Sequence, residues 1–177
     1  EGERSLGDFG PDDFGAILSL LHDEENLYIG LRVTDDDLCG GDTDSRDFVG
    51  SDYVRLYLCG TPPSERTEPT IGEEDLVLAL APFAQGGPAI RVPDYGMKLL
   101  ELPAPRTFAV ASRPVPGGYE LEIAIPWDAV GEGIGTGATV GFNLMLGDAD
   151  GGRREAEVTV GSQEGEYWTR TRAYVDL

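Results

Sequence analysis

The sequence predicts an all-β fold, an antiparallel β-sandwich with little or no helix. Three observations lead to this expectation. Apolar and polar residues alternate with a period of two in one segment after another, which places the apolar side chains on one face of a strand. Clusters of glycine, proline, asparagine and aspartate separate these segments at short intervals. Strands do not alternate with helical patterns, as they would in a parallel sheet.

Five segments show the clearest alternation. In the first, every second residue from Leu27 to Val33 is apolar, and Tyr28, Arg32 and Thr34 occupy the other face. The five predicted strands are residues 27–33, 54–58, 76–80, 119–125 and 140–146, and the shorter candidates are residues 16–21, 108–113, 156–160 and 173–177.

Turn residues join the predicted strands. Pro114 and Pro116 bracket a return that continues through two glycines, which favours a hairpin into the strand at 119–125. The stretch 127–131, Trp-Asp-Ala-Val-Gly, is the one helical candidate and is a turn at most. With no repeat, linker or low-complexity tail, we predict one domain over residues 1–177. Since residue 1 is Glu rather than Met, we expect an upstream part of the natural chain to have been removed.

The chain is strongly acidic. Its 33 acidic and 13 basic residues give a formal net charge of −20 at pH 7. This charge repels phosphate backbones and anionic membranes, which argues against nucleic-acid binding. No apolar run approaches membrane-spanning length, so we expect no membrane insertion. Three explanations of the acidity stay open: divalent-cation sites, a high-salt environment, and solubility alone.

Two aspartate-rich segments are candidate calcium ligands. Asp148 and Asp150 stand one residue apart before two glycines, which is half of a calcium loop without the later bidentate glutamate of an EF-hand. Asp36 lies at the centre of a second run, residues 35–37. Turn capping is the alternative for both segments, and an ion pair to a neighbouring arginine is a further alternative for Asp148 or Asp150.

Trp168 is the leading aromatic candidate for ligand contact. It follows the polar residues Gln163-Glu-Gly-Glu and one tyrosine, so we expect a loop in which its ring stacks on the apolar face of a pyranose. The alternative is a ring packed on the edge of the sandwich. Trp127 follows Ile-Pro and is expected to be structural. Four other side chains are expected on polar strand faces, of the kind that is usually solvated: Tyr28, Tyr53, Arg55 and Tyr57.

The two cysteines are too few to define a disulfide framework. Cys39 is expected near one end of the strand that Cys59 ends, so a bridge requires loop 37–51 to fold back along the sheet. The sequence leaves the bridge open.

No catalytic signature is present. The one histidine, His22, lies at a predicted turn, and no histidine–cysteine cluster exists for zinc. Glu120 and Glu122 form a carboxylate pair of the kind a glycosidase uses, but alternation on one strand face explains them equally well. We expect a protein that is not an enzyme.

Several phrases, in their order along the chain, resemble the family-nine carbohydrate-binding modules and their DOMON-like relatives. The phrase that begins His22-Asp-Glu-Glu-Asn resembles the early hairpin of the family, and Ser51-Asp-Tyr-Val-Arg resembles the following strand. Segments 118–127 and 141–153 are similar to the two late signatures, and the ending from Tyr167 is similar to the terminal strand. The resemblance implies a secreted, jelly-roll-like sandwich that contains calcium and binds sugar without catalysis.

The resemblance also implies where a sugar would bind. Well-studied members hold a sugar between two tryptophans, and Trp168 matches the C-terminal one. The other should lie just before Asp52, where this chain offers Phe48. Arg55 stands where the family has glutamate, and Met145 stands where it has an amide side chain. Asn143 is a further candidate for the rim.

Some DOMON-like domains bind haem through methionine with histidine or lysine, which makes haem binding a minor alternative. Met97, Met145, His22 and Lys98 are the candidate ligands here. Met97 and Lys98 are neighbours and would face opposite sides of a regular strand, and Met145 is expected to pack in the sheet.

We therefore predict a secreted or cell-surface module that binds a sugar or polysaccharide, stabilised by calcium and joined to other domains of a larger polypeptide. Its candidate ligand-binding residues are Trp168, Phe48, Arg55 and Asn143, and its candidate metal ligands are Asp148, Asp150 and Asp36. Arg55 would favour an acidic sugar because guanidinium pairs with carboxylate. The alternative is a structural or adhesion domain that binds no sugar.

Overall fold

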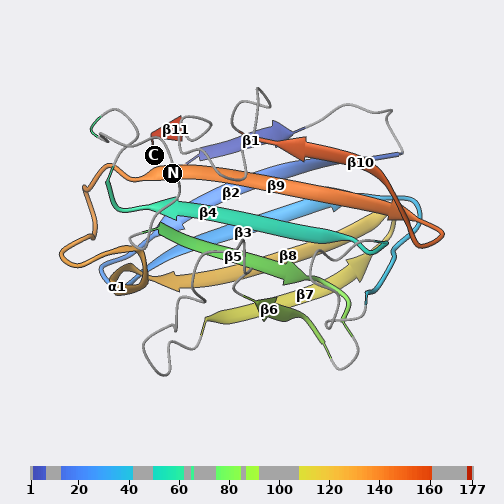
Figure 1. Ribbon diagram of the computed structural model, residues 1–177, viewed down its shortest axis with the longest axis horizontal. Helices are drawn as coiled ribbons and strands as arrows, with labels where there is room; N and C mark the ends of the chain where they lie inside the picture. Colours follow the sequence, from blue (N-terminus) through green and yellow to red (C-terminus); the bar gives the residue numbers. More distant parts are fainter. Residues whose placement is uncertain are drawn as a thin grey trace.

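The computed structural model describes residues 2–6, 13–41, 50–61, 65, 75–84, 87–91, 108–160 and 175–176. Two antiparallel sheets form a sandwich (Figure 1). Sheet A contains, in spatial order, β1 (Gly2–Leu6), β2 (Gly15–His22), β3 (Asn26–Thr34), β8 (Gly118–Pro126) and β7 (Ala109–Val115). Sheet B contains β10 (Arg153–Thr159), β9 (Gly141–Asp150), β4 (Tyr53–Cys59), β5 (Asp75–Ala81) and β6 (Ala89–Arg91), and β11 (Val175–Asp176) also pairs with β9.

The core lies between the two sheets and is built from the predicted alternation. The inward side chains of β3 and β8 meet those of β4, β5 and β9, and nearly all of them are less than 6 % exposed. On β3 these are the apolar residues at every second position from Leu27 to Val33, as predicted. Burial of these side chains supplies most of the favourable free energy of folding.

The outward face of sheet B is buried as well. Tyr53 and Tyr57 are at most 1 % exposed and Arg55 is 8 % exposed, so the prediction that they line a solvated face is wrong. Val77 and Ala79 project from β5 on the same side. Because β5 is apolar on both faces, it has the continuous apolar character of a strand with cover on each side.

The outward face of sheet A is open to solvent. Ile17, Leu21, Tyr28 and Arg32 are exposed there, on the strands β2 and β3. The outward face of sheet B is therefore buried, whereas that of sheet A is exposed.

The hairpin between β7 and β8 confirms the prediction made from its prolines and glycines. Gly117 and Gly118 have positive φ values of 76° and 143°, and a Cβ on Gly118 would collide with the carbonyl of Val33. The expected turn after β8 is α1 (Trp127–Val130), four residues long. Strands β1 and β6 were not predicted.

Two of the edge strands carry irregular features. A register shift between Arg154 and Ala156 makes a bulge in β10, which ends the described strand order of sheet B. Pro114 lies in β7, which ends the order of sheet A.

Cys39 and Cys59 are not joined in a disulfide. The Cys39 carbonyl accepts a hydrogen bond from the amide of Asp52, just before β4 begins, whereas Cys59 ends β4 and donates to the carbonyl of Thr61. The cysteines thus lie toward opposite ends of one strand. In the described part of the chain, no helix has the length and hydropathy to span a membrane.

Candidate functional site

Three buried aspartates come together at one end of the sandwich. Asp35 follows β3, Asp52 precedes β4, and Asp148 lies in β9. Each offers a carboxylate oxygen within 4.8 Å of the others, and they are 2 %, 1 % and 4 % exposed. We call these three residues the aspartate cluster.

Local backbone contacts hold the aspartate cluster in place. The amide of Asp35 donates to the carbonyl of Gly117 at 3.2 Å, which fixes the end of β3 against the β7–β8 hairpin. Asp52 accepts two backbone hydrogen bonds, from Cys39 at 2.8 Å and from Ala149 at 3.2 Å. Asp52 therefore ties the segment after β3 to the strand β9.

Burial and mutual repulsion raise the pKa values of all three carboxyls. Loss of solvent raises the pKa of Asp35 to about 6, with added repulsion from nearby aspartates. Loss of solvent and the neighbouring Asp35 raise the pKa of Asp52 to about 8. The same two causes raise the pKa of Asp148 to about 7. Without a cation, the cluster therefore holds protons near neutral pH.

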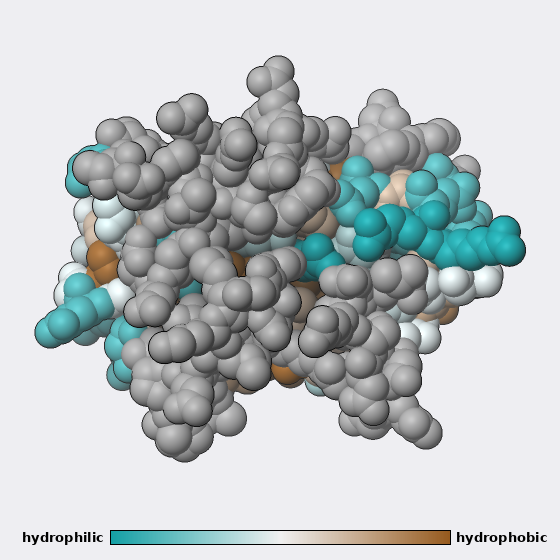
Figure 2. All heavy atoms as spheres, in the orientation of Figure 1, coloured by the Kyte–Doolittle hydropathy of each residue, from teal (hydrophilic) through white to brown (hydrophobic). Residues whose placement is uncertain are grey.

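A second acidic group shares Asp148. Asp148, Asp150 and Glu155 also bring carboxylate oxygens within 4.8 Å of one another, at the β9–β10 hairpin. Asp37 accepts a hydrogen bond from the amide of Gly151 at 3.0 Å, which joins this hairpin to the segment after β3. Figure 2 shows hydrophilic residues gathered at the end of the molecule where this hairpin lies in Figure 1.

The predicted metal ligands are only partly brought together. Asp148 and Asp150 lie in these acidic groups, whereas Asp36 is exposed and its neighbour Asp35 is the buried member. Strand parity contained this signal: Val33 points inward, so Asp35, two residues later, points the same way. Asp52 was missed because the sequence alone does not place it beside Asp35.

Arg55 and Asn143, two of the predicted sugar contacts, project from the outward face of sheet B. Arg55 pairs in register with Met145, so Asn143 is its diagonal neighbour on β9, with Cα atoms about 7–8 Å apart in such pairs. Asn143 is fully buried, and its Oδ1 accepts the amide of Leu144 at 2.9 Å. Phe48 and Trp168 lie outside the described residues.

Tyr53 organises the polar contacts beside Arg55. Two guanidinium groups lie over its ring, with the Cζ of Arg55 at 5.0 Å and that of Arg154 at 5.4 Å from the ring centroid. Its hydroxyl donates to Glu157 at 2.5 Å, and burial with this acceptor raises the Tyr53 pKa. Gly147 lies under the ring, where a Cβ would overlap it.

The remaining sequence candidates have structural surroundings. The indole of Trp127 is nearly buried and donates to the carbonyl of Asp23 at 3.0 Å. Glu120 and Glu122 share the outward face of sheet A, the strand alternation that the sequence also allowed. His22 ends β2 in sheet A, whereas Met145 faces outward from sheet B, so the two lie on different sheets and do not flank one haem iron. Met97 and Lys98 lie outside the described residues.

Comparisons with known proteins identify the architecture. A family model described as carbohydrate family 9 binding domain-like matches residues 95–176. A solved carbohydrate-binding module of family 9 from Caldicellulosiruptor kristjanssonii, in complex with cellotriose, matches with a TM-score of 0.70 and 17 % identity, over 99 % of this chain and 80 % of that chain. The fold is that of the family-nine carbohydrate-binding modules. A module of this family from the same organism, in complex with glucose, gives a TM-score of 0.69 and 18 % identity, over 95 % of this chain and 78 % of that chain. No curated protein matches the sequence.

These matches confirm the resemblance to family-nine modules and the predicted β-sandwich. The family match begins before β7 and includes β8, α1, β9 and β10, and it also spans the position of Trp168. The DOMON-like part of the resemblance is not addressed by them.

Proposed function

We propose that this chain is a non-catalytic carbohydrate-binding module. The observation that carries the proposal is its fold, which it shares with family-nine modules whose structures hold cellotriose or glucose. The family match over residues 95–176 supports the same assignment from the sequence side. Since the matching family model describes a binding domain, we propose that the chain does not turn over the glycan that it binds.

We place the sugar site on the outward side of sheet B, with Trp168 as the stacking platform and Phe48 opposite it. Arg55, which is 8 % exposed, supports this location as a contact, and Asn143, which is fully buried on the adjacent strand and projects to the same side, would support the site from beneath. A ring that stacks on a pyranose and polar groups that meet its hydroxyls are the two components that a sugar site needs.

Arg55 points to an acidic sugar as the ligand class. Its guanidinium is nearly buried against the ring of Tyr53, and Arg154 also lies over that ring. Arg154 is paired with Glu157 at 3.6 Å, so Arg55 is the cation proposed to meet the ligand on this face of a protein of net charge −20. A uronic-acid carboxylate would pair with Arg55 through parallel hydrogen bonds, which a neutral sugar cannot do.

We further propose that the aspartate cluster holds a structural calcium ion. The residues fit this ion: three carboxylates converge, and Oδ2 of Asp35 is buried without a hydrogen-bond partner in the described part of the chain. Calcium takes six to eight oxygen ligands, and carboxylates are its usual protein ligands. The bound ion would supply the positive charge that lets all three carboxylates ionise. Asp35, Asp52 and Asp148 would then tie the end of β3, the start of β4 and β9 together.

A secreted or cell-surface location fits this proposal because millimolar extracellular calcium suits sites of modest affinity. We also propose that the module is attached to other domains of a larger polypeptide. Binding alone changes no covalent bond, so any chemical change of the bound glycan would come from such a domain.

The test is a glycan array of neutral and acidic sugars in calcium buffer, with the wild-type chain and three variants. Trp168→Ala should abolish the signal of the acidic glycans, whereas Trp168→Phe should retain part of it because a ring remains. Arg55→Ala should remove acidic glycans selectively, and Arg153→Ala, an exposed arginine that the proposed site does not use, is the matched control for the lost charge. Unchanged binding of acidic glycans after Trp168→Ala would contradict the site, and no binding to any glycan would favour the structural or adhesion domain. Release of reducing sugar ends would contradict the absence of catalysis.

A further inference from the structure

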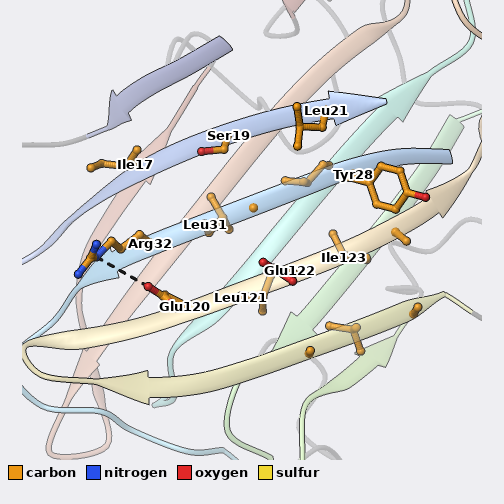
Figure 3. A pocket seen from close by; sticks show the side chains of 16 residues that line it. Ile17, Ser19, Leu21, Tyr28, Leu31, Arg32, Glu120, Leu121, Glu122 and Ile123 are labelled. Atoms are coloured by element: carbon orange, nitrogen blue, oxygen red, sulfur yellow. Dashed lines mark ion pairs between the residues drawn. The ribbon is translucent and has the colours of Figure 1, made fainter. Parts of the chain in front are cut away.

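The outward face of sheet A contains a shallow groove that the proposed site does not use. The groove runs across β2, β3, β8 and β7 and has a volume of about 720 Å³ (Figure 3). It lies on the opposite sheet from Arg55 and Asn143, with the whole core between them.

Strand register arranges the groove in three rows that cross the strands. One wall is apolar and contains Leu21 paired with Tyr28, followed by two alanines on β8 and β7. The floor pairs Ser19 with Gly30, and then reaches Glu122 and Ala111. Four strands at about 4.8 Å spacing make a groove about 14 Å long, which a short oligosaccharide fills.

The apolar wall presents an aromatic ring that is held in position. Tyr28 is 37 % exposed, yet its hydroxyl donates to Oδ2 of Asp23 at 2.7 Å. Asn26 donates to the same hydroxyl at 3.4 Å. Because its rotamer is fixed by these contacts, the ring loses little side-chain entropy when a ligand stacks on it.

The opposite wall and the floor supply hydrogen-bonding groups. Arg113 donates to Glu120 at 2.6 and 2.8 Å, and Arg32 lies 4.0 Å from the other oxygen of that carboxylate. Figure 3 shows Glu122 beside this wall. Among the described residues, no hydrogen bond or ion pair engages the Glu122 carboxylate, so both of its oxygens remain acceptors for a ligand.

The chemistry of the groove selects its occupant. One arginine, Arg32, and two glutamates line the groove, and Arg113 beside it pairs with Glu120, so no strong charge is left to prefer a highly charged polymer. The floor of small side chains has no deep pocket for peptide side chains, and the backbones of β3 and β8 are already paired on both sides, which prevents strand addition. Two hollow faces complement each other poorly, which disfavours a second copy. An aromatic ring, the available carboxylate of Glu122 and a floor of mostly small side chains suit a pyranose chain, which offers apolar ring faces and hydroxyl edges.

We infer that this groove is a second glycan-binding site, specific for a neutral oligosaccharide that lies across the strands. Tyr28 stacks on a sugar ring, and Glu122 accepts hydrogen bonds from its hydroxyls. This inference takes from the proposed function only the class of ligand, a glycan. The location of the second site is independent, because the two sites share no residue.

Gly30 provides a variant that blocks the groove without disturbing the fold. A Cβ on Gly30 would meet Ser19 at 3.7 Å, an ordinary contact, and its φ is not positive. Gly30→Val is therefore expected to fold normally and to fill the floor, since valine favours strands.

The experiment is an NMR titration of the ¹⁵N-labelled chain with cellohexaose and with xylohexaose. We expect the amides of Gly30 and Ala111 to shift with one of these probes in the wild type and equally in Trp168→Ala. Tyr28→Ala, Glu122→Gln and Gly30→Val should each weaken the affinity at these amides about five- to tenfold, since stacking or hydrogen bonding is worth about 1–1.5 kcal/mol. Tyr28→Phe keeps the ring and should change it by less, and Glu132→Gln, an exposed carboxylate elsewhere, is the matched control.

The outcomes separate the two proposals. Shifts confined to β4 and β9 that vanish in Trp168→Ala would overturn this inference and leave the proposed function standing. Shifts on sheet A without any on sheet B would support this inference and contradict the proposed location of the first site on sheet B. The absence of shifts on sheet A with either probe would overturn the inference. Self-association of the chain through this face, detected by sedimentation, would overturn it as well.

Discussion

Replacing Asp35 with asparagine tests whether the aspartate cluster destabilises the chain when it holds no cation. Burial raises the pKa of Asp35 from 3.8 to about 6, so the folded state binds a proton more tightly than the unfolded state does. The stability from this proton is complete below about pH 4 and is lost as the pH rises through 6. A shift of about 2 pKa units corresponds to about 3 kcal/mol, and solvent screening lowers the expected effect to about 1–3 kcal/mol.

The amide of asparagine carries no charge at any pH, so Asp35→Asn should avoid this loss. Its Nδ2 would take the place of the unpartnered Oδ2 and could donate to Asp52 or Asp148, while its Oδ1 still accepts the amide of Asp37. In EDTA at pH 8 we expect the melting temperature to rise by about 3–9 °C, at roughly 3 °C per kcal/mol for a chain of this size. At pH 4 the change should be small, and in saturating calcium the variant should be the less stable protein.

Differential scanning calorimetry at pH 4, 6 and 8, with EDTA and with calcium, measures all of these effects. Asp36→Asn removes the same charge from an exposed neighbour and should change stability by less than about 0.5 kcal/mol. An equal gain at pH 4 and pH 8, or a gain from Asp36→Asn as large as that from Asp35→Asn, would refute the electrostatic reasoning.

Two further predictions concern the cluster and the packing of sheet B. Calcium binding near pH 7 should release protons because the pKa values of Asp52 and Asp148 are raised to about 8 and 7. Isothermal titration calorimetry in buffers of different ionisation enthalpy would detect this release, and heats independent of the buffer would contradict it. Gly147→Ala should destabilise the chain by about 1–3 kcal/mol because its Cβ would overlap the ring of Tyr53. Urea unfolding measures the loss, and Gly151→Ala, which has open space but a φ of +53°, should cost about 1–2 kcal/mol from backbone strain alone.

The sequence predicted the sandwich well where one face of a strand is buried. On β3 the polar residues Tyr28 and Arg32 alternate with the core side chains, and the structure keeps this alternation. It failed for the outward face of sheet B, because Tyr53 and Arg55 read as polar although burial makes them part of a second layer. Strand β1 was missed because Gly-Glu-Arg-Ser-Leu has no apolar alternation, and its pairing with β2 is what defines it.

The candidate site was harder to predict because its members are distant in sequence. Asp35, Asp52 and Asp148 meet only because β3 ends where β4 begins and β9 passes beside β4. Strand parity identifies Asp35 rather than Asp36, but no local pattern joins either one to Asp148. The register that aligns Arg32 with Glu120 and Gly30 with Glu122 likewise follows from topology.

The borders of the two sheets matter for a protein that accumulates at high local concentration, as it would along a polymer. Open strand edges on neighbouring molecules can join into continuous sheets and precipitate. Here β10 carries a bulge and the exposed charges of Arg153 and Arg154, and β7 carries Pro114, which has no amide hydrogen to offer. At the β10 and β7 edges, crowded copies of this chain are therefore hindered from joining into a continuous sheet, which leaves β1 and β6 as the edges where such pairing would begin.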